Sequence, residues 1–397
     1  MSLGTRDYSS PRTPGFGQGH KPLLARALAK DSLLRQYDWV LVASVVALSL
    51  IGTLLVYSAT QPSADPRAYL MKQLINVALG LAFMVAVSLL DYRQIRLLAP
   101  IVYVLACLGL LVVLSPLGTT VSGARAWINL SAGFQVEPSE FAKIALVLVG
   151  ALIFSGLRDG GRIPRPRHAA VVLALAAVPV ALVALEPALG VVILLLVMAF
   201  GMIALSGLRL RWVAALAVAG ALAVVAVFKL HLLKGYQLTR LTAFLHPTAD
   251  PNGSGYETLH SKIMIGSGGM FGTGLLHGPL VTASFVPNQQ TDFIFSVAGE
   301  EIGFVGCAVI IAVLAILVFR ALRIAARADD QFGMLVASSI AIWFGLQSFV
   351  NIGMTIGIMP VTGLPLPFVS YGGSAMFADM IAVGVLLSVR RRHSVFG

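Results

Sequence analysis

The chain has 397 residues, of which 58% are hydrophobic and only 11% are charged, against about 25% charged residues in soluble domains. This composition excludes an ordinary soluble protein and predicts one integral membrane domain with many spans. The formal net charge of +11 does not indicate nucleic-acid binding, because the basic residues follow the membrane topology described below. Cys107 and Cys307 lie in apolar runs and are interpreted as small buried hydrophobic residues.

The N-terminal segment differs in composition from the rest of the chain. Residues 1–20 are rich in Ser, Pro, Gly and Arg and are expected to be disordered. Residues 22–36 place leucines at helical spacing among basic residues, which is typical of a helix on the membrane surface or of a simple juxtamembrane anchor. We therefore divide the chain into a cytoplasmic tail (1–36), a ten-span membrane domain (37–392) and a second cytoplasmic tail (393–397).

Ten apolar runs of about 20 residues, the length that crosses a bilayer, predict an all-α membrane protein. With the N-terminus inside, most of the 28 Lys and Arg residues fall in inner segments, so both termini are predicted to be cytoplasmic. The runs lie at about 38–59, 70–90, 94–115, 138–157, 168–185, 188–206, 212–231, 293–319, 333–356 and 374–389.

Two outer loops have unusual sequences. The loop between spans 7 and 8, residues 232–292, is far longer than a normal connection, and loops of that length are usually functional or disordered. We expect it to form short helices that lie on, or dip into, the outer face. The last outer loop, residues 359–374, has prolines and glycines that predict a compact backbone.

The long loop ends in a carboxylate, Asp292, and the next span carries two more, Glu300 and Glu301. Ionisable side chains inside a membrane helix are costly and indicate a functional path. Asp292 either caps the helix that follows or takes part in catalysis. The two glutamates are adjacent and point in different directions, so we expect at most one to face a cavity, with interhelical hydrogen bonds as the alternative for each.

Further candidate residues lie at the start of span 4 and in the loop before it. Glu140 and Lys143 are three residues apart and share a helix face. They form either a local ion pair or a cation for an anionic substrate group, held in place by Glu140. In the preceding loop, Arg125 is a candidate phosphate ligand through its planar guanidinium group. Trp127 is either an interfacial aromatic residue or a ligand platform.

Other polar residues are weaker candidates. Asp379 lies inside span 10 and Asn351 inside span 9, where hydrogen bonds between packed helices are the default interpretation. The histidines of the outer half match no metal-binding motif, so no protein-built metal site is predicted.

Three segments together resemble the SEDS family of bacterial cell-wall proteins, the RodA/FtsW/SpoVE group. The resemblance covers about residues 37–392, and the stretch 351–367 looks like the RodA, or elongation, branch. The three segments are Pro138-Ser-Glu-Phe-Ala-Lys143, Gln290-Thr-Asp-Phe-Ile-Phe295 with Gly299-Glu-Glu-Ile-Gly303, and Pro365-Leu-Pro-Phe-Val-Ser-Tyr-Gly-Gly-Ser374.

The resemblance implies a peptidoglycan glycosyltransferase in the bacterial plasma membrane. Such an enzyme polymerises lipid II, the undecaprenyl-pyrophosphate disaccharide-pentapeptide, on the outer face during cell elongation. A class B penicillin-binding protein is the implied cross-linking partner. Asp292 matches the aspartate regarded as essential in the family, and Glu140 and Lys143 match its cavity residues. Supporting polar positions are Glu300, Glu301, Ser370 and Asp379.

The implied chemistry needs a base for the acceptor hydroxyl and positive charge for the departing pyrophosphate. We assign the base to Asp292 and the positive charge to Lys143, Arg125 or a substrate-bound Mg²⁺ or Mn²⁺, in that order, with no built-in cofactor. The chain departs from the family at Ala188, where an Asp is usual, and at Asp379, where an Asn is expected.

Two rival functions fit the same features: a transporter of lipid II and a non-catalytic scaffold of the wall-synthesis complex. The polar clusters concentrate toward the outer face. A transporter needs polar groups along both halves of its path, so this distribution favours an enzyme.

Overall fold

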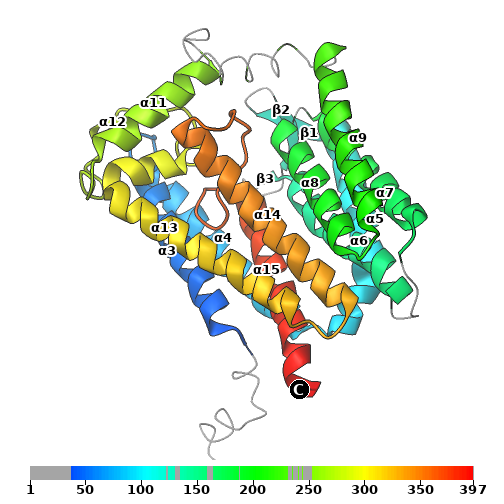
Figure 1. Cartoon of the computed structure of the whole chain (residues 1–397). Coiled ribbons are helices and arrows are strands. Elements are labelled where there is room, and N and C mark those ends of the chain that lie inside the picture. The colour runs from blue at the N-terminus through cyan, green and yellow to red at the C-terminus, as the bar shows by residue number, and fades with distance from the viewer. Residues whose placement is uncertain are drawn as a thin grey trace, which may run out of the picture. The chain divides into compact units, whose positions relative to one another are not determined.

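The computed structural model describes residues 37–121, 124–129, 135–158, 164–186, 188–230, 235, 240, 244 and 253–396. The predicted cytoplasmic tail at 1–36, with its expected disorder and juxtamembrane helix, lies outside these residues. Figure 1 shows an almost wholly helical architecture. The elements are α3 (Trp39–Ala59), α4 (Pro66–Leu89), α5 (Tyr92–Leu114), β1 (Gly118–Val121), β2 (Ala124–Asn129), β3 (Gln135–Val136), α6 (Pro138–Arg158), α7 (Pro166–Leu185), α8 (Leu189–Leu205), α9 (Leu210–Lys229), α11 (Ser254–Ser267), α12 (Pro279–Thr282), α13 (Ile294–Ala326), α14 (Gln331–Ile356) and α15 (Gly373–Phe396).

Each of the ten predicted spans is a helix, and most boundaries agree within about four residues. In the described part of the chain, nine helices are long and apolar enough to cross a membrane. The tenth, α8, is apolar and has 17 residues, the short end of the range that crosses a bilayer. The prediction of an all-α, multi-pass membrane protein is confirmed. The last helix is longer than expected and continues to Phe396.

The helices divide into a central, buried set and a peripheral set. In an apolar 18-residue stretch of α6, 78% of the residues are buried, and in α14 and α15 the share is 72%. In the corresponding stretch of α9, no residue is buried. Helix α6 packs against α5 and α14, and α15 packs against α4. The peripheral helices expose large apolar side chains, such as Leu97 on α5 and Phe319 on α13. Such side chains suit contact with lipid tails.

A small antiparallel sheet precedes α6 and was not predicted. Its strand order is β1-β2-β3, with Thr119 opposite Trp127 and Ile128 opposite Val136. The strands hold four, six and two residues, too few for a period-two pattern to stand out among the flanking loop residues. The sheet fixes the outer loop against the end of α5.

Helix α13 is broken at Gly303, whose φ of 66° lies in the left-handed region. A loop following α11 satisfies the backbone groups that the break leaves free. The amides of Phe304 and Val305 donate to Gly269 and Met270 at 2.9 and 3.1 Å, while Thr273 donates its amide to Glu300 O at 2.9 Å. Irregular backbone at membrane depth requires such partners. The long outer loop therefore packs into the membrane domain through α11, α12 and this loop.

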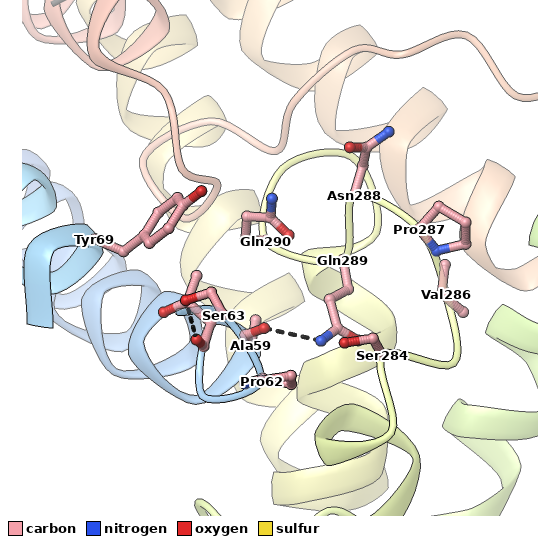
Figure 2. A pocket seen from close by; sticks show the side chains of 11 residues that line it. Ala59, Pro62, Ser63, Tyr69, Ser284, Val286, Pro287, Asn288, Gln289 and Gln290 are labelled. Carbon is pink, nitrogen blue, oxygen red and sulfur yellow. Dashed lines mark hydrogen bonds between the residues drawn. The ribbon is translucent and has the colours of Figure 1, made fainter. Parts of the chain in front are cut away.

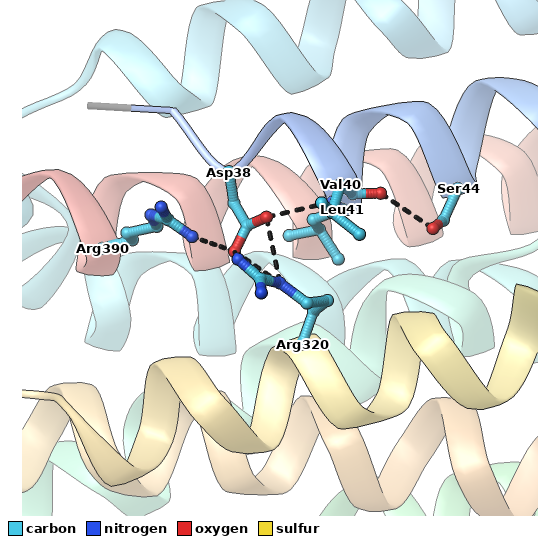
Figure 3. A network of polar contacts seen from close by, with 6 residues as sticks. All are labelled: Asp38, Val40, Leu41, Ser44, Arg320 and Arg390. Atoms are coloured by element: carbon cyan, nitrogen blue, oxygen red, sulfur yellow. Dashed lines mark hydrogen bonds and ion pairs between the residues drawn. The ribbon is translucent and has the colours of Figure 1, made fainter. Parts of the chain in front are cut away.

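The two ends of α3 are fixed by different polar contacts. At the C-terminal end, Gln289 donates its side-chain amide to Ala59 O at 2.8 Å (Figure 2). At the other end, buried Asp38 binds Arg320 of α13 and Arg390 of α15 (Figure 3). These three helix ends were all predicted to lie on the inner side, so their proximity agrees with the predicted topology.

Candidate functional site

Asp292 lies immediately before α13, at the end of the long outer loop. The N-cap position of α13 is Phe293, with no side-chain hydrogen bond to the cap, so the predicted capping role of Asp292 is not observed. The side chain is half-buried. A Cβ atom on Gly363 would lie 3.6 Å from Asp292 Oδ2, which places the carboxylate against the last outer loop.

The backbone around Asp292 is held by groups from α14 and the last outer loop. Asn351 Nδ2 donates to Asp292 O at 2.9 Å. Ser370 Oγ donates to Thr291 O at 2.6 Å, and the Tyr371 amide donates to Gln290 O at 2.9 Å. Three successive carbonyls are thus engaged, which fixes the direction of the Asp292 side chain. This explains the position of Ser370, which the sequence placed among the supporting residues.

Burial raises the pKa of Asp292 to about 6, and the Arg240 guanidinium and a hydrogen bond from Thr291 counteract this rise. A carboxyl with this pKa is largely ionised at neutral pH and is a stronger base than an exposed aspartate. Among the described cations, Arg240 is the one whose charge acts on the Asp292 titration. The sequence did not single out Arg240, because nothing in the long loop distinguishes one basic residue from another.

Two further carboxyl groups lie near the site. Burial raises the pKa of Glu137 to about 7, with additional repulsion from Glu140 and Asp292. Burial, followed by repulsion from Glu137, raises the pKa of Glu186 to about 8. Both residues sit at helix boundaries beside prolines. The proximity of Glu137 to Asp292 appears only in three dimensions.

Lys143 and Glu140 form a fully buried ion pair at 2.6 Å. Lys143 Nζ also donates to Gln347 Oε1 at 3.0 Å, and it lies 4.7 Å from the centroid of the Trp343 ring. Gln347 in turn donates to Pro365 O at 2.8 Å. Through Gln347, the ion pair is therefore linked to the last outer loop. The ammonium group has no exposed surface, so a pyrophosphate would reach it only after a rearrangement.

Arg125 and Trp127 lie two residues apart on β2 but differ in environment. Arg125 donates to Ser115 O at 2.7 Å and to Gly118 O at 3.2 Å, so its guanidinium holds the turn between α5 and β1. Trp127 instead lines a cleft of about 440 Å³ that reaches Thr291. Of these two candidates, Trp127 is the one placed beside the Asp292 segment.

Glu300, Glu301 and Asp379 lie away from the Asp292 carboxylate. Glu300 accepts from the amides of Leu280 and Val281 at 2.8 and 3.0 Å. Glu301 accepts from Ser58 Oγ and from the Leu276 amide. The two glutamates point to different partners, as expected for adjacent helix positions, and they secure the outer loop. Asp379 is buried in α15 within electrostatic reach of Lys143 and Glu140.

Apart from Arg125, which binds the turn before β1, the candidates form three groups: the Asp292 segment with Ser370 and Trp127, the Lys143–Glu140 pair with Asp379, and the two glutamates of α13. Within the described ranges, no cluster of three or more His, Cys, Asp or Glu side chains is arranged to hold a metal ion. Asn351, assigned by default to helix packing, contacts the Asp292 backbone directly.

Comparison with known proteins identifies the family. The family model of the FtsW/RodA/SpoVE cell cycle proteins matches residues 38–395. "Peptidoglycan glycosyltransferase MrdB" of Escherichia coli K12 is 38% identical over 353 residues, covering 88% of this chain and 93% of the relative. "Probable peptidoglycan glycosyltransferase FtsW" of Trichlorobacter lovleyi is 37% identical over 368 residues, covering 91% and 95%.

A solved structure described as "Structural coordination of polymerization and crosslinking by a peptidoglycan synthase complex" contains a chain with the same fold. Its TM-score is 0.74 at 31% identity, and the match covers 90% of this chain and 98% of that one. The sequence motifs, the helical order and these matches lead to one conclusion: the chain is a multi-pass plasma-membrane protein of the FtsW/RodA/SpoVE family of cell cycle proteins, the SEDS family.

Proposed function

We propose that the chain is a peptidoglycan glycosyltransferase that polymerises lipid II on the outer face of the bacterial plasma membrane. The observation that carries the proposal is the environment of Asp292. This carboxylate is half-buried with a pKa of about 6, is fixed by hydrogen bonds to its own backbone segment, and adjoins a cleft that reaches Thr291. Relatives at 37% and 38% identity bear the name of this activity.

In the proposed reaction, a sugar hydroxyl of one chain attacks the anomeric carbon of another lipid-linked sugar. A new C–O glycosidic bond forms as the C–O bond to the lipid pyrophosphate breaks, and the bonding electron pair leaves with the pyrophosphate. Asp292 takes the hydroxyl proton as attack proceeds. A single displacement of this kind inverts the configuration at the anomeric carbon.

The departing pyrophosphate needs positive charge. The sequence ranked Lys143 and Arg125 first, but both bind protein oxygen atoms here. Arg240 acts electrostatically on Asp292 and is partly exposed, so we assign this role to Arg240. A divalent cation carried by the substrate on its phosphate oxygens would add to this positive charge.

We further propose a class B penicillin-binding protein as partner, because a similar chain occurs in a complex described as coordinating polymerisation and crosslinking. We also assign the chain to the elongation branch. The features in favour are the RodA-like stretch at 351–367 and the match to MrdB. The match to an FtsW of nearly the same identity makes the branch a matter for a complementation test in elongation-defective and division-defective cells.

The decisive experiment measures glycan polymer formed from purified lipid II. The wild-type chain, co-expressed with its transpeptidase partner, is compared with Asp292→Asn at matched complex yield. We expect polymer from the wild type and none from the variant. The matched control is Asp65→Asn, since Asp65 also precedes an outer helix end, where it caps α4, and Asn caps a helix as well as Asp does.

The alternative outcomes separate the rival functions. Equal polymer from wild type and Asp292→Asn would remove Asp292 from the chemistry. No polymer from the wild type in the presence of Mg²⁺ or Mn²⁺ would contradict the enzyme and favour a transporter or a scaffold. Movement of labelled lipid II across proteoliposome membranes then distinguishes those two.

A further inference from the structure

Two clefts lie side by side along the segment that leads to Asp292. The first, of about 190 Å³, is drawn in Figure 2. The second, of about 440 Å³, extends from there to Gly373. Tyr69, Asn288 and Gln290 line both clefts, so the two adjoin and together make up one groove along this segment. We call it the outer groove. Two adjoining clefts offer room for more than one unit of a chain-like ligand.

The groove is lined by aromatic rings. Tyr69 of α4 and Tyr371 of the last outer loop have ring centroids 5.3 Å apart at an interplanar angle of 59°. Trp127 of β2 lines the same cleft. All three are partly exposed, and aromatic side chains of this kind combine a broad apolar face with a polar atom.

Polar groups stand between these rings. Gln290 is partly exposed and lines both clefts. Asn76 is only 4% exposed, and its Oδ1 atom has no hydrogen-bond partner in the described structure. A buried amide oxygen without a partner is unfavourable. Asn76 lines the larger cleft, but this oxygen itself has almost no exposed surface, so a ligand donor would reach it only after a rearrangement of the cleft wall.

The lining identifies the class of ligand. Sugar rings present apolar C–H faces, which stack on aromatic rings, and hydroxyl or amide edges, which bond to side-chain amides. A lipid tail would gain nothing from Gln290 and Asn76. Lys72, exposed at the same cleft, suits the carboxylates carried by a peptidoglycan strand. The geometry is that of an elongated saccharide site.

We propose that the outer groove binds a linear oligosaccharide, namely the sugars of the glycan strand that do not react in the current cycle. This inference rests on the proposed function, because the glycan is the product of that reaction. Thr291, the residue before Asp292, lines the larger cleft, so a strand held there passes beside the Asp292 segment. Retention of the strand between additions makes the polymer longer without changing the bond-forming step.

The direct test measures binding of a soluble, lipid-free peptidoglycan tetrasaccharide to the full-length chain in nanodiscs. We expect saturable binding by the wild type, about tenfold weaker binding by Tyr69→Ala, and near wild-type binding by Tyr69→Phe, which keeps the ring. The matched control is Phe319→Ala, which removes an exposed aromatic ring far from the groove, on the cytoplasmic half of α13, and should bind like the wild type. A thermal unfolding scan of each variant checks folding.

A second measurement separates this inference from the proposed function. In polymerisation from lipid II, Tyr69→Ala should give shorter strands than the wild type. The rate of the first coupling should fall by a smaller factor than the strand length does. Equal tetrasaccharide binding by Tyr69→Ala and wild type, or absence of binding by the wild type, would overturn the groove assignment even if polymer forms. If the wild type makes no polymer yet binds the tetrasaccharide through Tyr69, the groove assignment holds and the catalytic proposal fails.

Discussion

Asn351 joins the Asp292 carbonyl to the Leu364 carbonyl through one side-chain amide. Its Nδ2 atom donates to Asp292 O at 2.9 Å and to Leu364 O at 2.7 Å. Asn351 is fully buried in α14, which belongs to the central set of helices. The position of the proposed base is therefore set by a rigid helix and by the last outer loop together.

Replacement of Asn351 by Ala should lower kcat about 10- to 100-fold, because a small displacement of a positioned base costs that much. KM should change little, since Asn351 does not face the clefts. Asn351→Asp, which keeps the shape but loses the donor, should behave like Asn351→Ala. The control is Ser348→Ala on the same helix, whose buried hydroxyl has no partner in the described structure. A rise in KM with unchanged kcat in Asn351→Ala would contradict the positioning role.

The pH dependence of polymerisation should follow the ionisation of Asp292. The base must be unprotonated, and burial raises its pKa to about 6. The rate should therefore rise with pH, reach half its maximum near pH 6, and fall to about a tenth at pH 5. Removing the Arg240 charge with Arg240→Gln should move the midpoint to higher pH, because this guanidinium lowers the pKa of Asp292.

Arg67→Gln is the matched control for that shift. Arg67 is an exposed cation at the start of α4, and it is not among the charges that act on Asp292. The pH–rate profile of Arg67→Gln should have the same midpoint as that of the wild type. A midpoint that stays in place in Arg240→Gln would show that Arg240 lies away from the reacting carboxylate in the working enzyme.

The Lys143–Glu140 pair should behave as a buried structural ion pair. Lys143→Met leaves Glu140 without its cation at 2% side-chain exposure, which should cost about 3 kcal/mol of stability. Combining it with Glu140→Gln should restore most of the loss, because neither charge is then left alone. Thermal unfolding in detergent measures both. A double variant as unstable as Lys143→Met alone would mean that Lys143 acts mainly through Gln347 and Trp343.

Gly303→Ala should destabilise the fold by about 2 kcal/mol or more, since the left-handed backbone and the docked loop both exclude a Cβ atom. That atom would lie 2.3 Å from the backbone nitrogen of Gly272. The control is Gly266→Ala in α11, where a Cβ atom meets nothing within 4 Å and alanine favours the helix. Equal Tm values for the two variants would contradict the proposed docking of the loop onto α13.

The helical frame was predictable because membrane spans are specified by local composition. Ten apolar runs give ten helices, and the pairing of Asp38 with Arg320 and Arg390 brings together ends that the basic residues had placed on one side. The break at Gly303 was not predicted, because the run that contains it has no proline and is apolar on both sides of Glu300 and Glu301. What interrupts the helix is a partner loop some 30 residues earlier in the chain.

The sequence by itself determined the class of protein, the order and approximate bounds of its spans, the family, and the candidate residue Asp292. These follow from hydrophobicity, charge and short motifs, which are local properties of the chain. The tertiary structure decided which polar residues meet. It enclosed Lys143, engaged Arg125 with the turn before β1, brought Arg240 close to Asp292, and packed Tyr69 against Tyr371 in the wall of the outer groove. Such contacts connect residues tens to hundreds of positions apart, and they depend on how helices pack and loops dock.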